Sequence, residues 1–157
     1  MQHRMKEFSM TREAVERLLH RAQVGRFSTI GEDGYPYTVA VHFVYMDGRI
    51  YFHGLPRGRK LDNIARCPKV CFEADEMTAL MLENLEHPCK ADTEYESAFA
   101  AGTAGLIDGA REKEVILREI IKKYAPQLIG MEMPENMIGG TAVVKMEIER
   151  MTGKYHR

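Results

Sequence analysis

The eight residues from His53 to Lys60, His-Gly-Leu-Pro-Arg-Gly-Arg-Lys, carry more potential chemistry than any other stretch of the sequence. The histidine closes a strand-like segment, two glycines allow a tight loop, and Arg59 and Lys60 begin a short helical pattern. The first turn of a helix favours an anion through its unpaired N–H groups and its dipole. We therefore interpret Arg59 and Lys60 as a phosphate site, with a solvated basic turn as the alternative.

A second polar cluster, Arg26-Phe27-Ser28-Thr29, supplies a guanidinium and two hydroxyl groups along one predicted strand. Alone this cluster is typical of a half-exposed strand. It indicates a binding site only if the fold brings it to the same ligand as Arg59 and Lys60. His53 is the candidate for proton exchange with a redox-active ring, because an ordinary histidine pKa of about 6.5 suits proton transfer near neutral pH. A merely structural strand histidine is the alternative.

Other site chemistries have weaker support. Cys67 and Cys71 have a C-x3-C spacing with no second Cys or His pair at zinc spacing, so no metal site is expected. Cys71 falls in an apolar strand and is interpreted as a small core residue. The run Gly102-Thr103-Ala104-Gly105 lacks the strand-to-helix setting of a dinucleotide fingerprint, and no Walker A sequence is present.

The composition is that of one globular domain, residues 1–157. With 22 basic and 23 acidic residues and 45% hydrophobic residues, the chain is neither disordered nor basic enough for whole-surface binding to nucleic acid or anionic membrane. It has no bilayer-spanning apolar run and no secretory signal, and three cysteines cannot all pair, so we expect a cytoplasmic protein. Charge is segregated: Arg49 to Lys69 is basic and Glu73 to Glu96 is acidic.

The elements that must position these residues are mostly strands. Period-two alternation predicts six of them, at residues 26–30, 37–45, 49–53, 70–74, 95–107 and 142–149. Asp47-Gly48 predicts a hairpin turn, so the first three strands are expected to form a meander. Small residues in the fifth strand predict a close backbone approach at its glycines, Gly102 and Gly105.

Helical spacing predicts helices at residues 11–23, 59–66 and 108–124. We expect Thr11 to cap the first and Asp108 to cap the last, whose core stripe would be Val115, Ile116, Ile120 and Ile121. Residues 1–10 are expected to be a flexible segment or to lie strapped along the surface, and residues 76–93 are compatible with strand or helix. Hairpin links between strands imply an antiparallel sheet or barrel with flanking helices.

The run from Val24 to Asp75 resembles the pyridoxamine 5′-phosphate oxidase-like FMN-binding split-barrel family, and within it the nitroimidazole-resistance (Nim) flavoproteins. The likeness continues through Tyr95-Glu96-Ser97, Gly102-Thr103-Ala104, Lys123-Tyr124-Ala125-Pro126 and Thr152-Gly153-Lys154. It implies a mainly β fold, a six-stranded antiparallel split β-barrel, that forms a homodimer with FMN at the subunit interface.

The resemblance also implies which residues contact the cofactor, with Ser97 reaching it from the other subunit: Arg26, Phe27, Ser28, Thr29, His53, Gly54, Arg59, Lys60 and Ser97. His53 would lie beside the flavin ring as the catalytic side chain. Glu96 stands where many relatives have arginine, and His42 where many have asparagine or leucine. An anion contact at position 96 and the role of His42 therefore stay open.

We accordingly expect an FMN-dependent oxidoreductase, similar to nitroimidazole reductases, that acts on a small-molecule electron acceptor. One alternative keeps the barrel but uses deazaflavin or haem, and another is a non-enzymatic flavin-binding module. Pyridoxamine phosphate oxidation is disfavoured because the chain is short and no substrate-binding tail is found after Lys154. The sequence indicates neither the physiological substrate nor the electron donor.

Overall fold

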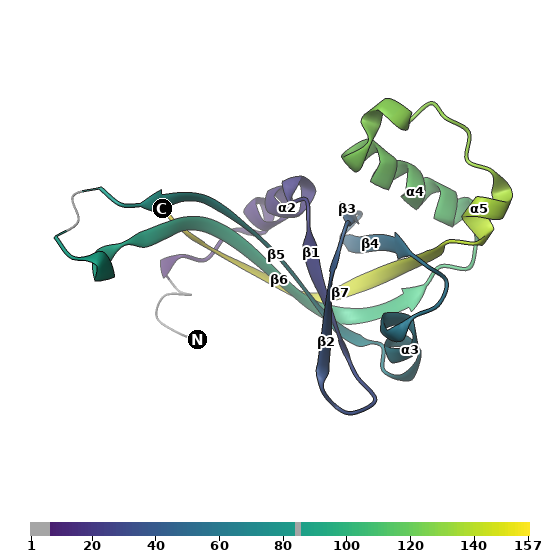
Figure 1. Cartoon of the computed structure of the whole chain (residues 1–157), viewed down its shortest axis with the longest axis horizontal. Helices are drawn as coiled ribbons and strands as arrows, with labels where there is room; N and C mark the ends of the chain where they lie inside the picture. The colour runs from purple at the N-terminus through teal and green to yellow at the C-terminus, as the bar shows by residue number, and fades with distance from the viewer. Residues whose placement is uncertain (1–6, 84–85) are drawn as a thin grey trace.

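The computed structural model describes residues 7–83 and 86–157, and in them seven antiparallel strands form one sheet in the order β2-β1-β5-β6-β7-β4-β3 (Figure 1). This confirms a mainly β antiparallel split barrel with flanking helices. The strands are β1 Gly25–Ile30, β2 Pro36–Val41, β3 Val44–Met46, β4 Arg49–Gly54, β5 Lys69–Met81, β6 Asp92–Leu106 and β7 Ala142–His156. The helices are α2 Arg12–Arg21, α3 Arg59–Arg66, α4 Ala110–Tyr124 and α5 Glu135–Gly139, with 3-10 turns η1 Pro88–Lys90 and η2 Pro126–Leu128.

The two edge strands of the sheet, β2 and β3, are separated in sequence by only His42 and Phe43. The sheet must therefore curl until its edges approach, which closes the barrel. The predicted strand 37–45 is thus wrong as one element, because it breaks where the chain crosses between edges, and the sheet has seven strands rather than six. The predicted meander is also wrong, since β1 pairs with β2 while β3 and β4 pair at the opposite edge.

Aromatic side chains fill the barrel. The rings of Phe27 and Phe52 lie 4.7 Å apart, as do those of Phe43 and Phe72, so opposite walls touch through the core. Outside the barrel, a smaller apolar cluster joins β3, β4 and β7 to α4. Its buried members are Val44, Tyr51, Ile107, Ile116, Ile120 and Val143. Cys71 is only half-buried, on the outward side of β5, so its prediction as a core residue is wrong.

The predicted helices are present with small differences at their ends. Thr11 caps α2 by accepting a hydrogen bond from the N–H of Ala14 at 3.3 Å, as expected. Asp108 does not cap α4, because the chain turns into the helix one residue later, at Gly109, where no side chain bonds the free N–H groups. Ile116 and Ile120 are buried as predicted, whereas Val115 is half exposed.

The undecided segment 76–93 belongs mostly to an arm in which β5 and β6 run beyond the barrel (Figure 1). β5 reaches Met81 and β6 begins at Asp92, while residues 84–85 lie outside the described part of the chain. Arg21 holds the base of the arm through ion pairs with Glu76, at 2.6 Å, and Glu96. The end of the arm is exposed on both faces, so its sequence carries no alternation.

The expected N-terminal segment is strapped to β7 where the structure describes it. The N–H of Met10 donates to the carbonyl of Gly153, and that of Tyr155 to the carbonyl of Phe8, both at 3.0 Å. Residues 1–6 of the same prediction lie outside the described residues. Among the described helices, none has the length and apolar character needed to cross a bilayer.

Candidate functional site

The loop between β4 and α3 places a lysine over a glycine. Gly58 has a φ of 144°, in a region that favours glycine, and this lets the chain enter α3 directly after the loop. The ammonium of Lys60 then lies 3.4 Å from the point that a Cβ on Gly54 would occupy. No hydrogen bond or ion pair joins Lys60 to another residue of the described chain. Lys60 therefore offers a cation above bare backbone at the end of β4.

Arg59 points to a different neighbour, the turn between β1 and β2. Its Nη2 donates to Asp33 Oδ2 at 3.2 Å, and its guanidinium lies 4.8 Å from the ring centre of Tyr37. The side chains of Arg59 and Asp33 are 53% and 55% exposed. An ion pair in such open solvent contributes little, so Arg59 can turn to another anion at small cost.

A buried hydrogen bond fixes α3 beneath the barrel. Asn63 Nδ2 donates to Thr29 Oγ1 at 2.9 Å, and the threonine hydroxyl donates in turn to the carbonyl of Tyr37 at 3.3 Å. Both side chains are almost fully buried. Sequence reasoning missed Asn63, although a polar residue between Leu61 and Ile64 on the apolar face of α3 is a signal that could have found it.

The other predicted residues of β1 point to opposite sides of its sheet. Phe27 is fully buried in the barrel, as Thr29 is, whereas Arg26 and Ser28 face outward. Arg26 pairs with Glu73, at 2.8 Å, and with Asp75, and Ser28 shares a hydrogen bond of 2.8 Å with Thr38.

Ser97 belongs with this outward-facing pair. It lies directly opposite Asp75 in the β5–β6 register, so its side chain is on the same outer face as Arg26 and Ser28. His53, Gly54, Arg59 and Lys60 are called the β4-end group because they lie at or just after the end of β4 in the chain. Lys60 lies over Gly54 on the barrel side of the strand, whereas His53 faces the α4 side. Three strands lie between β1 and β4 in the sheet, and no hydrogen bond or ion pair in the described chain joins the two groups.

His53 opens into an apolar cavity. Along β4, Ile50 and Phe52 face the barrel interior, and His53 faces outward on the side where α4 packs. It contributes to the wall of a cavity of about 340 Å³, whose other walls come from α4 and the segment between α4 and β7. The side chains from α4 and from the segment between α4 and β7 are mostly apolar. His53 is one of the few polar groups that line the cavity.

The surroundings of His53 favour its neutral form. His53 is exposed at the mouth of the cavity, and partial desolvation by the cavity walls lowers its pKa, which the nearby His42 lowers further. The His42 ring stacks on Tyr124 with ring centres 4.4 Å apart and planes 14° apart. A neutral imidazole can donate from one ring nitrogen and accept at the other. His42 is thus an electrostatic neighbour of His53.

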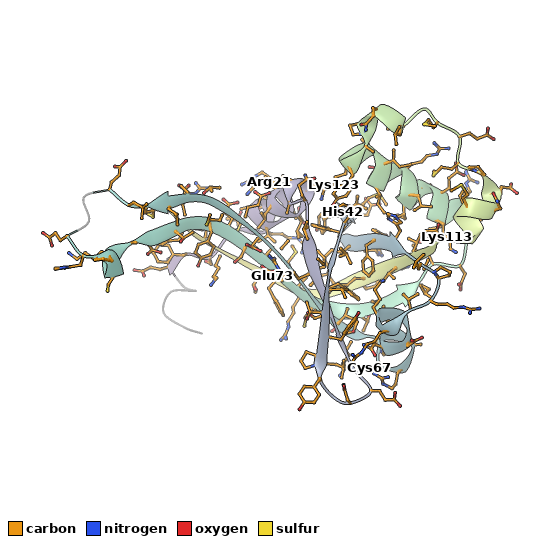
Figure 2. All side chains as sticks on the ribbon, in the orientation of Figure 1. Arg21, His42, Cys67, Glu73, Lys113 and Lys123 are labelled. Carbon is orange, nitrogen blue, oxygen red and sulfur yellow. The ribbon has the colours of Figure 1, made fainter. Side chains whose placement is uncertain are left out.

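Lys123 joins the same end of α4 to the barrel and to α2. Its Nζ donates to the carbonyl of Leu19 at 3.2 Å and lies 4.0 Å from the ring centre of Phe43. Burial of this ammonium lowers its pKa from 10.5 to about 8. Figure 2 shows Lys123 and His42 close to the point where α4 meets the barrel.

Comparisons with known proteins agree with this architecture. Residues 11–155 match the protein family described as pyridoxamine 5′-phosphate oxidase. A candidate 5-nitroimidazole antibiotic resistance protein from Bacteroides thetaiotaomicron is 23% identical and has a TM-score of 0.82, with 94% of this chain and 86% of that chain covered. No curated protein matches the sequence.

Two further solved structures share the fold. The flavocytochrome Anf3 from Azotobacter vinelandii is 18% identical, with a TM-score of 0.85 over 99% of this chain and 72% of that one. An FAD-binding protein from Mesorhizobium loti is 16% identical, with a TM-score of 0.69 over 95% and 97% of the two chains. At these identities the likeness establishes the arrangement of strands and helices alone.

Proposed function

The chain belongs to the pyridoxamine 5′-phosphate oxidase family, and on that premise we propose that it binds FMN and acts as an oxidoreductase on a small-molecule electron acceptor. The observation that carries the proposal is the position of the Lys60 ammonium over Gly54, directly after His53. Gly54 and Lys60 lie on the barrel side of β4, and His53 faces the α4 side, so a flavin whose phosphate is held at Lys60 would have to pass round the end of β4 to bring its ring to the cavity that His53 lines.

The residues at the end of β4 fit the phosphate of a flavin mononucleotide. The Lys60 ammonium has no hydrogen-bond or ion-pair partner among the described residues, and Arg59 is held by its exposed pair with Asp33 and its contact with the Tyr37 ring. The bare backbone of Gly54 lets an anion approach the ammonium without meeting a Cβ. Asp33 and Asp62 lie in the same hollow as Arg59, which limits the local positive charge and favours one phosphate over two.

Each side chain of this group has a task that its environment supports. A bound flavin supplies the electron transfer, and the protein supplies binding, orientation and a proton at the right place. Lys60 and Arg59 would hold the phosphate. The lowered pKa of His53 favours its neutral form, in which one ring nitrogen carries a proton and the other can accept one at the cavity edge. The apolar walls would border that edge, which stays open to solvent because His53 is exposed.

We further propose that two copies complete one site. Arg26, Ser28 and Ser97 lie on an outer sheet face that no helix of the described chain covers, and Phe99 is exposed on the same face. That group could meet the β4-end group only across a subunit boundary.

The oligomeric state tests this part of the proposal. Light scattering should give the mass of a dimer for the wild-type protein. Phe99→Lys should shift the mass toward that of a monomer, whereas Val115→Lys, on the exposed surface of α4, should not. A wild-type monomer would contradict this part of the proposal.

The function is tested by the visible spectrum and the mass of whatever ligand co-purifies. We expect yellow protein containing FMN, and loss of that flavin in the double variant Arg59→Ala, Lys60→Ala. The double variant Arg111→Ala, Lys122→Ala removes the same two charge types from α4 and should keep the flavin. A haem spectrum, a deazaflavin mass, or colourless protein that ignores added FMN would contradict the proposal.

Catalysis needs a separate assay. Purified protein supplied with a reduced nicotinamide cofactor and several acceptors, nitroaromatic compounds among them, should oxidise the nicotinamide and reduce the acceptor. Tight FMN binding without turnover under these conditions would favour the non-enzymatic flavin-binding module.

A further inference from the structure

The cavity beside His53 is closed on one side by the connection between α4 and β7, residues 125–141. This connection holds only the single turns η2 and α5, yet it is tied at its end. Thr141 Oγ1 donates to the carbonyl of Met137 at 2.8 Å, and Lys113 Nζ donates to the carbonyl of Thr141 at 3.1 Å. A long connection that is anchored across a cavity is more typical of a binding wall than of a simple link.

The wall is unusual in its chemistry. Three of its residues are methionines, Met131, Met133 and Met137, and α4 adds only aliphatic side chains opposite them. Glu132 is the one charged residue that lines the cavity, and no lysine or arginine does so. The Thr141 hydroxyl is already bonded to the backbone. His53 is therefore left as the neutral polar partner for a ligand.

We propose that this cavity is the acceptor site and that it selects uncharged, flat aromatic compounds, with the methionine thioethers against the ring faces and edges and His53 as the hydrogen-bonding partner. Sulfur–aromatic contacts are favourable, and unbranched methionines adapt to rings of different outline. The volume of about 340 Å³ is at the small end of ligand pockets, which suits one or two rings. This inference rests on the proposed function, because it takes His53 to lie beside the cofactor.

The same chemistry excludes anionic substrates, including pyridoxamine 5′-phosphate. An anion in the cavity would lose its hydration without gaining a cation, and it would face the carboxylate of Glu132. The two cations nearest in the chain, Arg59 and Lys60, do not line the cavity and are already assigned to the phosphate of the cofactor. Pyridoxamine 5′-phosphate, the compound that the family's name gives as oxidised, is therefore not a ligand that this cavity favours.

Two probes of similar shape and different charge test the selection. Nitrobenzene and 4-nitrobenzoate share a nitroaromatic ring, and only the second carries a carboxylate. Titrated into the protein as purified and followed by ligand-observed NMR, nitrobenzene should bind at least tenfold more tightly. Equal affinity, or a preference for 4-nitrobenzoate, would overturn the inference.

A charge placed in the wall should reverse the preference. Met137→Lys should strengthen 4-nitrobenzoate binding and weaken nitrobenzene binding, each by several-fold. Val115→Lys is the control, because Val115 on α4 is 50% exposed, lines no part of the cavity and lies away from the proposed subunit boundary. The control should leave both affinities unchanged. If Met137→Lys and Val115→Lys behave alike, the probes bind elsewhere and the inference is wrong.

Flavin content measured on the same samples separates this inference from the proposed function. Protein that retains flavin but binds both probes equally would overturn the cavity assignment and leave flavin binding intact. Protein that carries no flavin but still prefers nitrobenzene, with the reversal in Met137→Lys, would support the cavity and contradict the cofactor.

Discussion

The hydroxyl of Tyr124, the last residue of α4, accepts a hydrogen bond of 2.9 Å from the backbone N–H of Phe43. The same hydroxyl lies 2.9 Å from the carbonyl oxygens of Phe43 and Gln23, to one of which it donates. Phe43 sits at the break between β2 and β3, where the barrel closes. The Tyr124 hydroxyl thus replaces the hydrogen bonds that the backbone of Phe43 would make inside a continuous strand. It also anchors α4, the helix that forms one wall of the His53 cavity.

Tyr124→Phe should therefore destabilise the protein by about 1–3 kcal/mol, the usual cost of leaving buried polar groups unsatisfied. Tyr35→Phe, at a 73% exposed position, should change the free energy of unfolding by less than about 0.5 kcal/mol. Urea denaturation of both variants checks the difference. Equal stability of the two would mean that the hydroxyl does not hold the break.

Gly102 allows β6 and β7 to approach each other at a bulge between Ala101 and Gly102. A Cβ on Gly102 would overlap the carbonyl oxygen of Glu147, whereas one on Gly105 would meet nothing within 4 Å. Gly102→Ala should thus cost about 3 kcal/mol or more, because backbone must shift, and Gly105→Ala should cost less than about 1 kcal/mol. Thermal unfolding of the two variants tests this, and a similar loss in both would contradict it.

The same pair of glycines shows what the sequence could and could not predict. A strand rich in small residues indicates a close approach somewhere, and the prediction is confirmed at Gly102 and wrong at Gly105. Likewise, the alternation in residues 37–45 indicates extended chain but not the break at His42. That break comes from closure of the barrel, which depends on partners distant in sequence, and no glycine or proline marks it.

The residues at the end of β4 could be predicted from the sequence because they are close together along the chain. His53, Gly54, Arg59 and Lys60 lie within eight residues, so they must all lie near one strand end, and the structure places Lys60 over Gly54 while His53 faces the other side of β4. Ser97 and the methionine wall depend on the register of β5 with β6 and on the course of a connection without periodicity. Neither leaves a pattern in the sequence.

His53 should titrate below its ordinary pKa of 6.5, because burial and His42 both disfavour its charged form. His42→Gln removes a group that can carry positive charge and should raise the His53 pKa, whereas His87→Gln, on the exposed arm, should not. NMR titration of the imidazole resonances measures both. Activity that needs the neutral ring should be constant above pH 7 and fall only as the pH drops below 6.5. A His53 pKa at or above 6.5 would contradict this electrostatic description.

Lys123 should make stability depend on pH between about 8 and 10.5. Its folded pKa is below its unfolded value, so in this window the unfolded chain binds more protons and the folded state gains as pH rises. Relative to Lys123→Met, wild-type protein should therefore gain stability from about pH 8 to about pH 10. The slope is at most about 1.4 kcal/mol per pH unit and smaller in practice, because the ammonium is half exposed. Urea denaturation at several pH values checks it, and a constant difference would contradict it.

The claim that Lys60, with Arg59, receives a flavin phosphate beside His53 is tested most directly by comparing FMN with riboflavin, which lacks the phosphate. We predict that wild-type apoprotein binds FMN at least about 100-fold more tightly than riboflavin, as two charge-assisted hydrogen bonds would provide. In the double variant Arg59→Ala, Lys60→Ala, FMN should bind about as weakly as riboflavin, and the affinity for riboflavin should not change. Equal affinity of wild-type protein for the two flavins, or an unchanged ratio in the double variant, would contradict the claim.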